Sequence, residues 1–155
     1  MTNKSLKFFM REQIEEIVTA PAPKGFTDGE GNPLELEIKV LSNARIQEIF
    51  ASYRKRSVAV DDKGRPFLTP TGEVCFQTER DSARAVRHTI AEALVYPDLK
   101  DPELMKFYNC VDITDMPLKV FTSTDEYAHV NKMVMNALGL GDQQTDSTLI
   151  EAAKN

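Results

Sequence analysis

Histidine and cysteine are scarce in this chain of 155 residues, and their scarcity argues against most metal and nucleophile chemistry. The sequence holds two of each, His88, His129, Cys75 and Cys110, and they are dispersed. A structural zinc site usually takes four such ligands, and mere coexistence does not make a Cys–His nucleophile pair. There is also no CxxC pair, GxSxG motif or dense cysteine framework. We therefore predict no metal, no cofactor and no enzyme, with free thiols in a reducing cytosol.

Long apolar runs and an excess of basic charge are absent too. No window is long enough to span a membrane, and the apolar patch at residues 5–10 is too short for a signal peptide. The formal net charge is −5, whereas proteins that bind nucleic acid through its phosphates usually carry a basic patch. The densest basic run, Arg54-Lys55-Arg56, also suits a helix end. We expect a cytoplasmic protein that binds neither nucleic acid nor membrane.

The periodicity of the apolar residues predicts an α+β fold. A small antiparallel sheet or hairpin in the N-terminal half is expected to pack on a mainly helical C-terminal half. Residues 14–20 are β-branched enough for a strand, which the prolines after it limit to a sheet edge. Residues 34–41 alternate, with Leu36 and Ile38 on the apolar face. The Gly-rich and Pro-rich stretch between these two runs predicts the hairpin turn.

That turn also has part of a calcium-loop pattern. Asp28, Glu30 and Asn32 occupy loop positions one, three and five. Pro33 stands where the loop needs glycine, and Lys39 stands where it needs a bidentate glutamate. The pattern therefore predicts a turn and no calcium site.

The middle of the chain is the least determined. Residues 43–56 have helical spacing, with an apolar stripe that ends at Tyr53. Residues 58–68 suggest a second hairpin around the turn at 61–64, and the whole stretch 57–77 is either an insertion or a loop. A long helix is predicted from Thr78, with Asp81 completing a capping box, to the break at Tyr96-Pro97. Its Arg80, Arg84 and Arg87 form either a solvated, ion-paired face or a surface for an acidic partner.

Three further helices follow. The first is predicted to begin after Asp101, with Pro102 in its first turn, and to end near Asn109. Its inward residues are expected to be Leu104, Phe107 and Tyr108. A short helix spans 114–121, and the last begins at a capping box and ends at Gly139. We predict one domain over residues 1–140 and a polar, flexible tail over 141–155.

Six apolar residues are candidates for contact with a partner. Those at the N-terminus either pack on the core or form an exposed handle, and those after the break at Pro97 face either the core or a partner. The six residues are Leu6, Phe8, Phe9, Met10, Tyr96 and Leu99.

The run from Tyr96 to Leu104, YPDLKDPEL, resembles a segment of the XkdN-like tail assembly chaperones of tailed phages and defective prophages of Gram-positive bacteria. Two other pieces agree in order and spacing: the turn at 26–33 with its strand, and the apolar helix that begins at 125–127 and ends at Gly139. The resemblance spans about residues 7–140. The chain departs from the family at Asn109-Cys110, where Tyr-Gly is frequent, and in the length of 57–77.

This resemblance implies a non-enzymatic role in the host cytoplasm. Such proteins bind the tape measure protein, keep it soluble while tail tube subunits polymerise around it, and are absent from the finished virion. The tail tube protein and a second copy of the chain are further candidate partners, and many members have a longer form made by frameshifting. Two alternatives remain open: a prophage-encoded adaptor or regulatory domain, and a small enzyme of unrecognised type.

Overall fold

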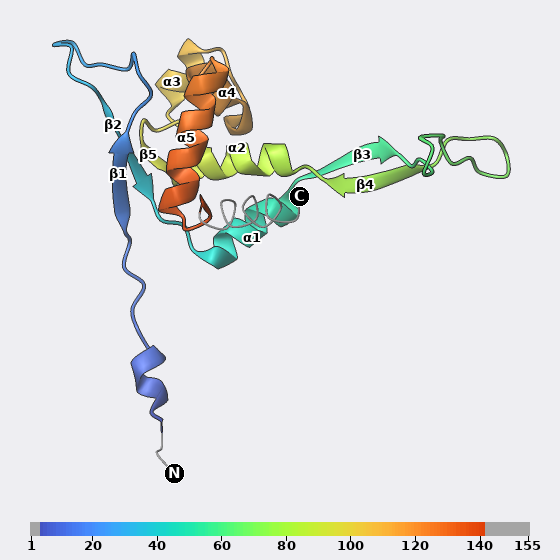
Figure 1. The fold of residues 1–155 in the computed structure, drawn as a ribbon, viewed down its shortest axis with the longest axis horizontal. Helices are drawn as coiled ribbons and strands as arrows, with labels where there is room; N and C mark the ends of the chain where they lie inside the picture. The colour runs from blue at the N-terminus through green and yellow to red at the C-terminus, as the bar shows by residue number, and fades with distance from the viewer. Residues whose placement is uncertain (1–3, 142–155) are drawn as a thin grey trace, which may run out of the picture.

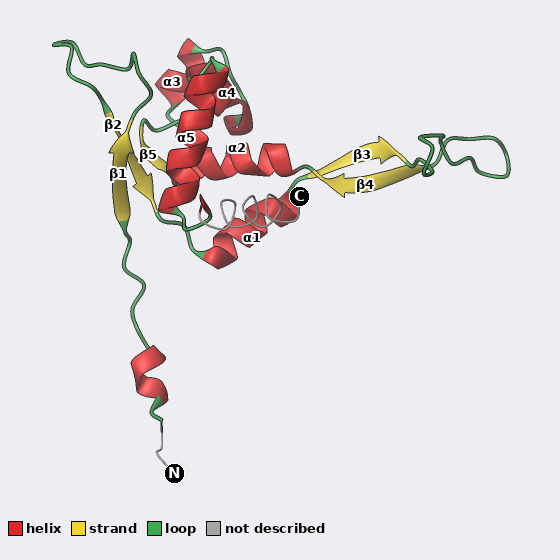
Figure 2. Cartoon of the chain, in the orientation of Figure 1, coloured by secondary structure: helices red, strands yellow, loops and turns green. Residues whose placement is uncertain are grey.

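A small antiparallel sheet and a group of helices meet around helix α2, while a hairpin arm and an N-terminal segment extend away from them (Figure 1, Figure 2). The computed structural model describes residues 4–141. The elements in chain order are η1 (Leu6–Phe9), β1 (Ile17–Pro21), β2 (Glu35–Lys39), α1 (Asn43–Ser52), β3 (Arg54–Val58), β4 (Phe76–Arg80), α2 (Ser82–Ala93), β5 (Leu94–Tyr96), α3 (Pro102–Phe107), η2 (Ile113–Asp115), α4 (Met116–Val120) and α5 (Thr124–Ala137). The α+β prediction is confirmed.

The main sheet has the strand order β1-β2-β5, and both of its pairings are antiparallel. The predicted alternation in β2 is confirmed, because Leu36 and Ile38 are buried while Glu35 and Glu37 are exposed. Strand β1 lies at the edge, as its terminal proline requires. His129 of α5 donates from Nε2 to the carbonyl of Pro21 (2.8 Å), so a helix from the C-terminal half fixes the end of this edge strand.

Helix α2 is the centre of the core and contacts α1, α4, α5 and β5. Its small residues Ala85, Ala91 and Ala93 are fully buried, which lets neighbouring elements approach closely. Thr89 is buried as well, and its hydroxyl donates to the carbonyl of Ala85 (2.8 Å), so its polar atom is satisfied within the helix. The remaining core side chains come from β2, α1, α4, α5 and the turns between them.

Three sequence predictions near α2 are wrong. The helix begins at Ser82 and not at Thr78, because residues 76–80 pair with 54–58 as strand β4; Asp81 is the N-cap. Helix α1 ends at Ser52 for the same reason, so the basic run Arg54-Lys55-Arg56 lies in a strand and not at a helix end. Residues 94–96 leave the helix to pair with β2. In each case non-local strand pairing overrides local helical periodicity.

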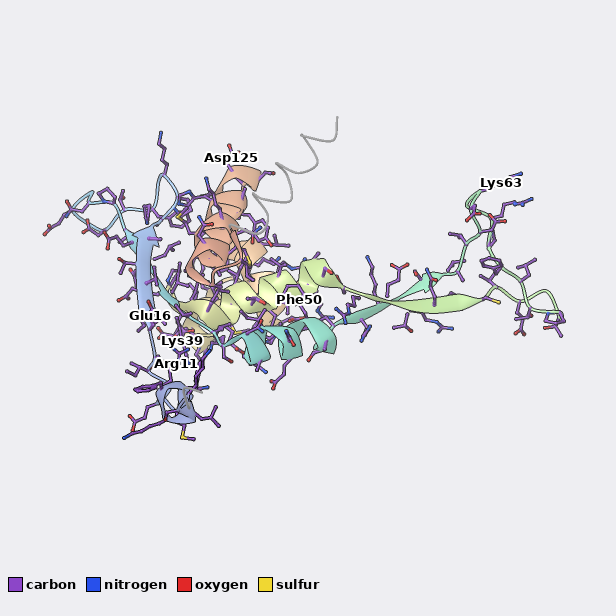
Figure 3. The ribbon with its side chains drawn as sticks, turned by 60° about the horizontal axis from the view of Figure 1, so that its bottom comes forward. Arg11, Glu16, Lys39, Phe50, Lys63 and Asp125 are labelled. Carbon is purple, nitrogen blue, oxygen red and sulfur yellow. The ribbon has the colours of Figure 1, made fainter. Side chains whose placement is uncertain are left out.

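Strands β3 and β4 form the stem of an arm that projects away from the core over residues 54–80 (Figure 1). Figure 3 shows Lys63 at its far end, distant from Phe50 on α1. The turn predicted at 61–64 is present, since Val60 pairs with Pro66. A second tight hairpin follows it, in which Leu68 pairs with Val74. The stretch 57–77 is therefore an ordered pair of small hairpins on a two-stranded stem.

One five-residue turn occurs three times in the chain. It spans 28–32, 61–65 and 69–73, and in each copy the first side chain (Asp28, Asp61 or Thr69) accepts from the amide of the fifth residue. The fourth residue is always a glycine with φ between +78° and +89°, a conformation that only glycine adopts readily. The Asp28 carboxylate accepts three hydrogen bonds within this turn, which together lower its pKa.

The predicted caps of the C-terminal helices are confirmed. Asp101 accepts from the amide of Leu104 (3.1 Å), and Ser123 and Glu126 form a reciprocal capping box. Helix α5 ends at Ala137, and Gly139 two residues later has φ +79°. The amide of Leu140 donates to the carbonyl of Met135, four residues before Gly139 (2.8 Å). That bond belongs to a Schellman ending.

Phe107 was predicted to face inward, and this is wrong, because it is 79% exposed. Leu104 and Tyr108 lie four residues apart and share the inward side of the short helix α3. The predicted tail 141–155 lies outside the described residues except for Gly141, so the division at residue 140 stays a prediction.

Candidate protein-binding surfaces

The N-terminal segment presents a short apolar helix to solvent. Helix η1 is capped by Ser5, whose hydroxyl accepts from the amide of Lys7 (3.2 Å), and it extends away from the sheet (Figure 1). Packing of this helix on the core, one of the two sequence alternatives, is therefore wrong. The exposed fractions are 72% for Leu6, 85% for Phe8, 84% for Phe9 and 76% for Met10.

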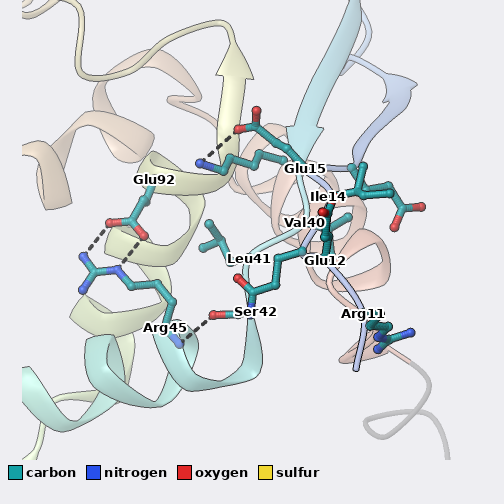
Figure 4. Close-up of a pocket in the computed structure, with 12 residues that line it drawn as sticks. Arg11, Glu12, Ile14, Glu15, Val40, Leu41, Ser42, Arg45 and Glu92 are labelled. Atoms are coloured by element: carbon teal, nitrogen blue, oxygen red, sulfur yellow. Dashed lines mark hydrogen bonds and ion pairs between the residues drawn. The ribbon is translucent and has the colours of Figure 1, made fainter. Parts of the chain in front are cut away.

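Residues 11–16 connect this helix to β1 and form one wall of an open groove (Figure 4). The amide of Val40 donates to the carbonyl of Glu16 (2.9 Å), and Lys39 pairs with Glu15 (3.1 Å), so the wall is fastened to the end of β2. The groove has a volume of about 1160 Å³, and residues 39–42, Arg45 and Glu92 line its other side. Ile14, 87% exposed, stands on the wall beside it.

Arg45 and Glu92 give the groove a fixed polar end. The guanidinium donates from Nε (2.8 Å) and Nη2 (2.6 Å) to the two carboxylate oxygens of Glu92, and from Nη1 to Glu48 (3.0 Å). Hydrogen bonding from Arg45 lowers the pKa of Glu92 to about 2, and the same bonds raise the pKa of Arg45. Both charges persist through the neutral range, and they join α1 to α2 at this end of the groove.

His88 belongs to the same polar network. Its Nε2 lies 3.3 Å from Glu92 Oε1, and its Nδ1 is hydrogen-bonded to the hydroxyl of Tyr53. The order Tyr–His–Glu is superficially that of a catalytic relay. However, a tyrosine hydroxyl replaces the serine or cysteine nucleophile, and both Tyr53 and His88 are half-buried. Among residues 4–141, no three metal-ligating side chains lie close enough together to hold a metal ion. The arrangement fits a structural link between α1 and α2.

The arginines of α2 also serve the fold. Arg84 pairs through Nη2 with Asp112 (2.6 Å). Hydrogen bonds from Thr114, and after them this contact with Arg84, lower the pKa of Asp112. Arg87 donates from Nε to the carbonyl of Thr114 (2.8 Å). The ion-paired alternative therefore holds for Arg84, and both side chains fasten η2 to the helix. Arg80 is separated from them, because it lies in β4.

Tyr96 and Leu99, the other two predicted contact residues, have different environments. Tyr96 lies in β5, at the sheet edge opposite β1, and is 46% exposed. Leu99 is fully buried in the core, so its side chain is not presented to a partner and we withdraw it from the predicted set. The structure brings Leu6, Phe8, Phe9 and Met10 together, but it leaves Tyr96 on the far side of the sheet.

Two sets of exposed apolar side chains were missed in the sequence. One set comprises Phe107, Val111 and Leu118, which come from α3, the loop after it and α4, with exposed fractions of 79%, 95% and 46%. The other is on the hairpin arm, which carries Val58, Val60, Leu68, Val74 and Phe76, among others, at 39–59%. The alternation of apolar residues at even positions from 58 to 76 was the signal for the arm, and the two intervening turns obscured it.

No helix among the described residues has the length and apolar character needed to cross a membrane.

Comparison with known proteins gives concordant matches along the chain. A family model described as the phage XkdN-like tail assembly chaperone protein matches residues 6–154. Over 152 residues, 97% of this chain and 93% of each relative, the sequence is 32% identical to protein YqbN and 29% identical to the phage-like element PBSX protein XkdN, both of Bacillus subtilis (strain 168).

A solved structure agrees with these sequence matches. The crystal structure of the protein YqbN superposes with a TM-score of 0.67 at 26% identity, covering 89% of this chain and 98% of that one. The family match includes both the N-terminal apolar helix and the arm. On these grounds the chain belongs to the phage XkdN-like tail assembly chaperone family.

Proposed function

We propose that this protein binds the phage tape measure protein in the host cytoplasm and keeps it soluble until tail tube subunits enclose it. In this role it acts without catalysis and does not remain in the finished virion. The tail tube protein is a second candidate partner, met when the tape measure protein is handed over. Family membership supports a role in tail assembly, and the choice of partner and mechanism is the proposal.

The observation that carries the proposal is the exposed apolar helix at the N-terminus. Leu6, Phe8, Phe9 and Met10 are all more than 70% exposed, although the same chain buries a complete core. Apolar patches that stay exposed commonly mark interaction sites. A partner helix that docks on this patch can continue into the adjoining groove, where the exposed Ile14 offers further apolar contact.

The charge of the chain suits a protein that carries an insoluble partner. A long helical polypeptide that awaits its tube exposes apolar stripes, and covering them removes the surface through which copies aggregate. The net charge of −5 then adds repulsion between complexes. Leu6, Phe8, Phe9 and Met10 supply contact, and the net negative charge of the chain supplies solubility.

Light scattering from a tape measure fragment tests the proposal. We expect the fragment, taken from the same phage element, to aggregate less as the full-length protein is added, and the two to elute together from a size-exclusion column. A variant with serine at positions 6, 8, 9 and 10 should lose most of this protection. Because these side chains touch no core residue, its thermal unfolding should match that of the wild type.

The matched control replaces Phe107, Val111 and Leu118 by serine, which removes exposed apolar surface elsewhere. It should protect the fragment as well as the wild type does. Unchanged scattering at a molar excess of wild-type protein would refute the proposed function. Equal loss in the two variants would show that protection depends on general surface apolarity and not on the N-terminal helix.

A further inference from the structure

The arm carries a continuous apolar face. Residues paired across an antiparallel ladder point to the same side, as do residues two apart in one strand. Val58 pairs with Phe76, Val60 with Pro66 and Leu68 with Val74. Along the chain, each pair is linked to the next by residues two positions apart: 58 and 60, 66 and 68, and 74 and 76. These relations place one set of side chains on a single face: Val58, Val60, Pro66, Leu68, Val74 and Phe76.

This face is held by a triangle of backbone hydrogen bonds. The amide of Ala59 donates to the carbonyl of Cys75, that of Phe67 to Ala59, and that of Cys75 to Phe67. The stem and the two small hairpins therefore meet at one point, and the residues on either side of it form the apolar face. No helix of residues 4–141 covers the arm (Figure 3), and a two-stranded hairpin alone is marginally stable in water. The arm accordingly offers an apolar surface whose burial would stabilise it.

Three arginines continue the same face toward the core. Arg54 and Arg80 are direct cross-strand partners, and Arg56 lies two residues along from Arg54. Like charges directly opposite one another destabilise a sheet, and no carboxylate among the described residues forms an ion pair with any of the three. The guanidinium of Arg56 lies 4.0 Å above the ring of Phe76, so charge and apolar face adjoin. Residues 54–80 contain six basic and four acidic side chains, in a chain with a net charge of −5.

We propose that this face of the arm binds an amphipathic segment of a phage tail protein in which carboxylates border an apolar stripe. The stripe covers the six apolar side chains, and the carboxylates pair with Arg54, Arg56 and Arg80, removing their mutual repulsion. This inference rests on the proposed function and adds a second contact, separate from the N-terminal helix. A second copy of the chain is a weaker occupant, because two copies of net charge −5 repel each other.

The test uses the full-length protein and two synthetic helical peptides of equal length. Both carry the same leucine stripe, which is bordered by glutamates in one peptide and by lysines in the other. Fluorescence anisotropy should give a dissociation constant about tenfold lower for the glutamate peptide, and added salt should reduce the difference. Equal affinity for the two peptides would overturn the inference.

Adjacent residues on opposite faces of the arm supply matched controls. Arg56→Glu should raise the dissociation constant of the glutamate peptide about tenfold. Lys55→Glu makes the same charge change on the other face and should leave this constant near the wild-type value. Leu68→Ser should likewise weaken binding, and Phe67→Ser should not; the two side chains are 59% and 53% exposed. The inference would be overturned if Arg56→Glu and Lys55→Glu lost equal affinity for the glutamate peptide, and Leu68→Ser and Phe67→Ser did the same. Self-association of the wild type that Leu68→Ser abolishes would assign the face to a second copy instead.

The tape measure fragment separates this inference from the proposed function. If the wild type binds the fragment and Arg56→Glu and Leu68→Ser bind it equally well, the arm inference fails and the proposed function stands. If the wild type binds the glutamate peptide but not the fragment, the proposed function fails and the ligand chemistry of the arm is supported. If it binds neither, both fail.

Discussion

Replacing Leu99 by alanine should destabilise the protein strongly without affecting partner binding. Its side chain is fully buried in the core, in the turn between β5 and α3. Leucine-to-alanine changes at such sites cost about 2–5 kcal/mol, because the transfer free energy is lost and a cavity remains. Taking about 3 kcal/mol, and about 2–4 °C per kcal/mol for a chain of this size, the melting temperature should fall by roughly 6–12 °C.

Urea unfolding followed by circular dichroism measures this loss. The midpoint should move to lower urea while the slope stays unchanged, since the surface exposed on unfolding hardly differs. Phe107→Ala is the control: it removes a larger side chain that is 79% exposed, so its effect should stay within about 0.5 kcal/mol. A loss below about 1 kcal/mol for Leu99→Ala, or an equal loss for Phe107→Ala, would refute the placement of the two residues.

Three further predictions concern caps and charge. The pKa of Glu92 is about 2 in the folded protein against an ordinary 4.5, so its contribution to stability is complete above pH 4.5 and is lost as pH falls toward 2; the urea midpoint of Glu92→Gln should decline less steeply across that window. Ser123→Ala should cost about 1 kcal/mol in urea unfolding, and Ser123→Asp, which keeps a capping oxygen, should cost much less. Gly139→Ala should lower the melting temperature by about 2–4 °C, because alanine is strained at φ +79° although no atom obstructs its methyl group; an unchanged value would contradict the helix ending described for α5.

Local signals in the sequence were reliable where a residue's role depends on its immediate neighbours. The caps at Asp101 and Ser123 follow from side-chain-to-backbone hydrogen bonds over three residues. The stop at Gly139 follows from the positive φ that glycine adopts readily. The alternation around Leu36 and Ile38 identified a half-buried strand, since one face of β2 meets the core. The exposed N-terminal helix was only one of two open alternatives, because an apolar terminus has the same sequence whether it docks or projects.

Predictions failed where a distant segment decides the local structure. Residues 78–80 and 94–96 have helical periodicity, but they pair with β3 and β2 and become strands. For the same reason, the basic run Arg54-Lys55-Arg56 lies in strand β3 and not at the predicted helix end. Phe107 was predicted to face the core and is exposed, and Leu99, for which core and partner were both open, is buried. Each lies in or beside a short element whose inward side depends on its neighbours.

The sequence by itself determined the fold class, the family and the ends of the last helices, because these depend on periodicity, turn residues and capping side chains that interact within a few positions. The tertiary structure alone decided that residues 54–80 leave the core as an arm. It also decided that six apolar side chains and three arginines share one face of that arm. Their common side follows from cross-strand register, which joins residues as far apart as Arg54 and Arg80 and cannot be known until the strands pair.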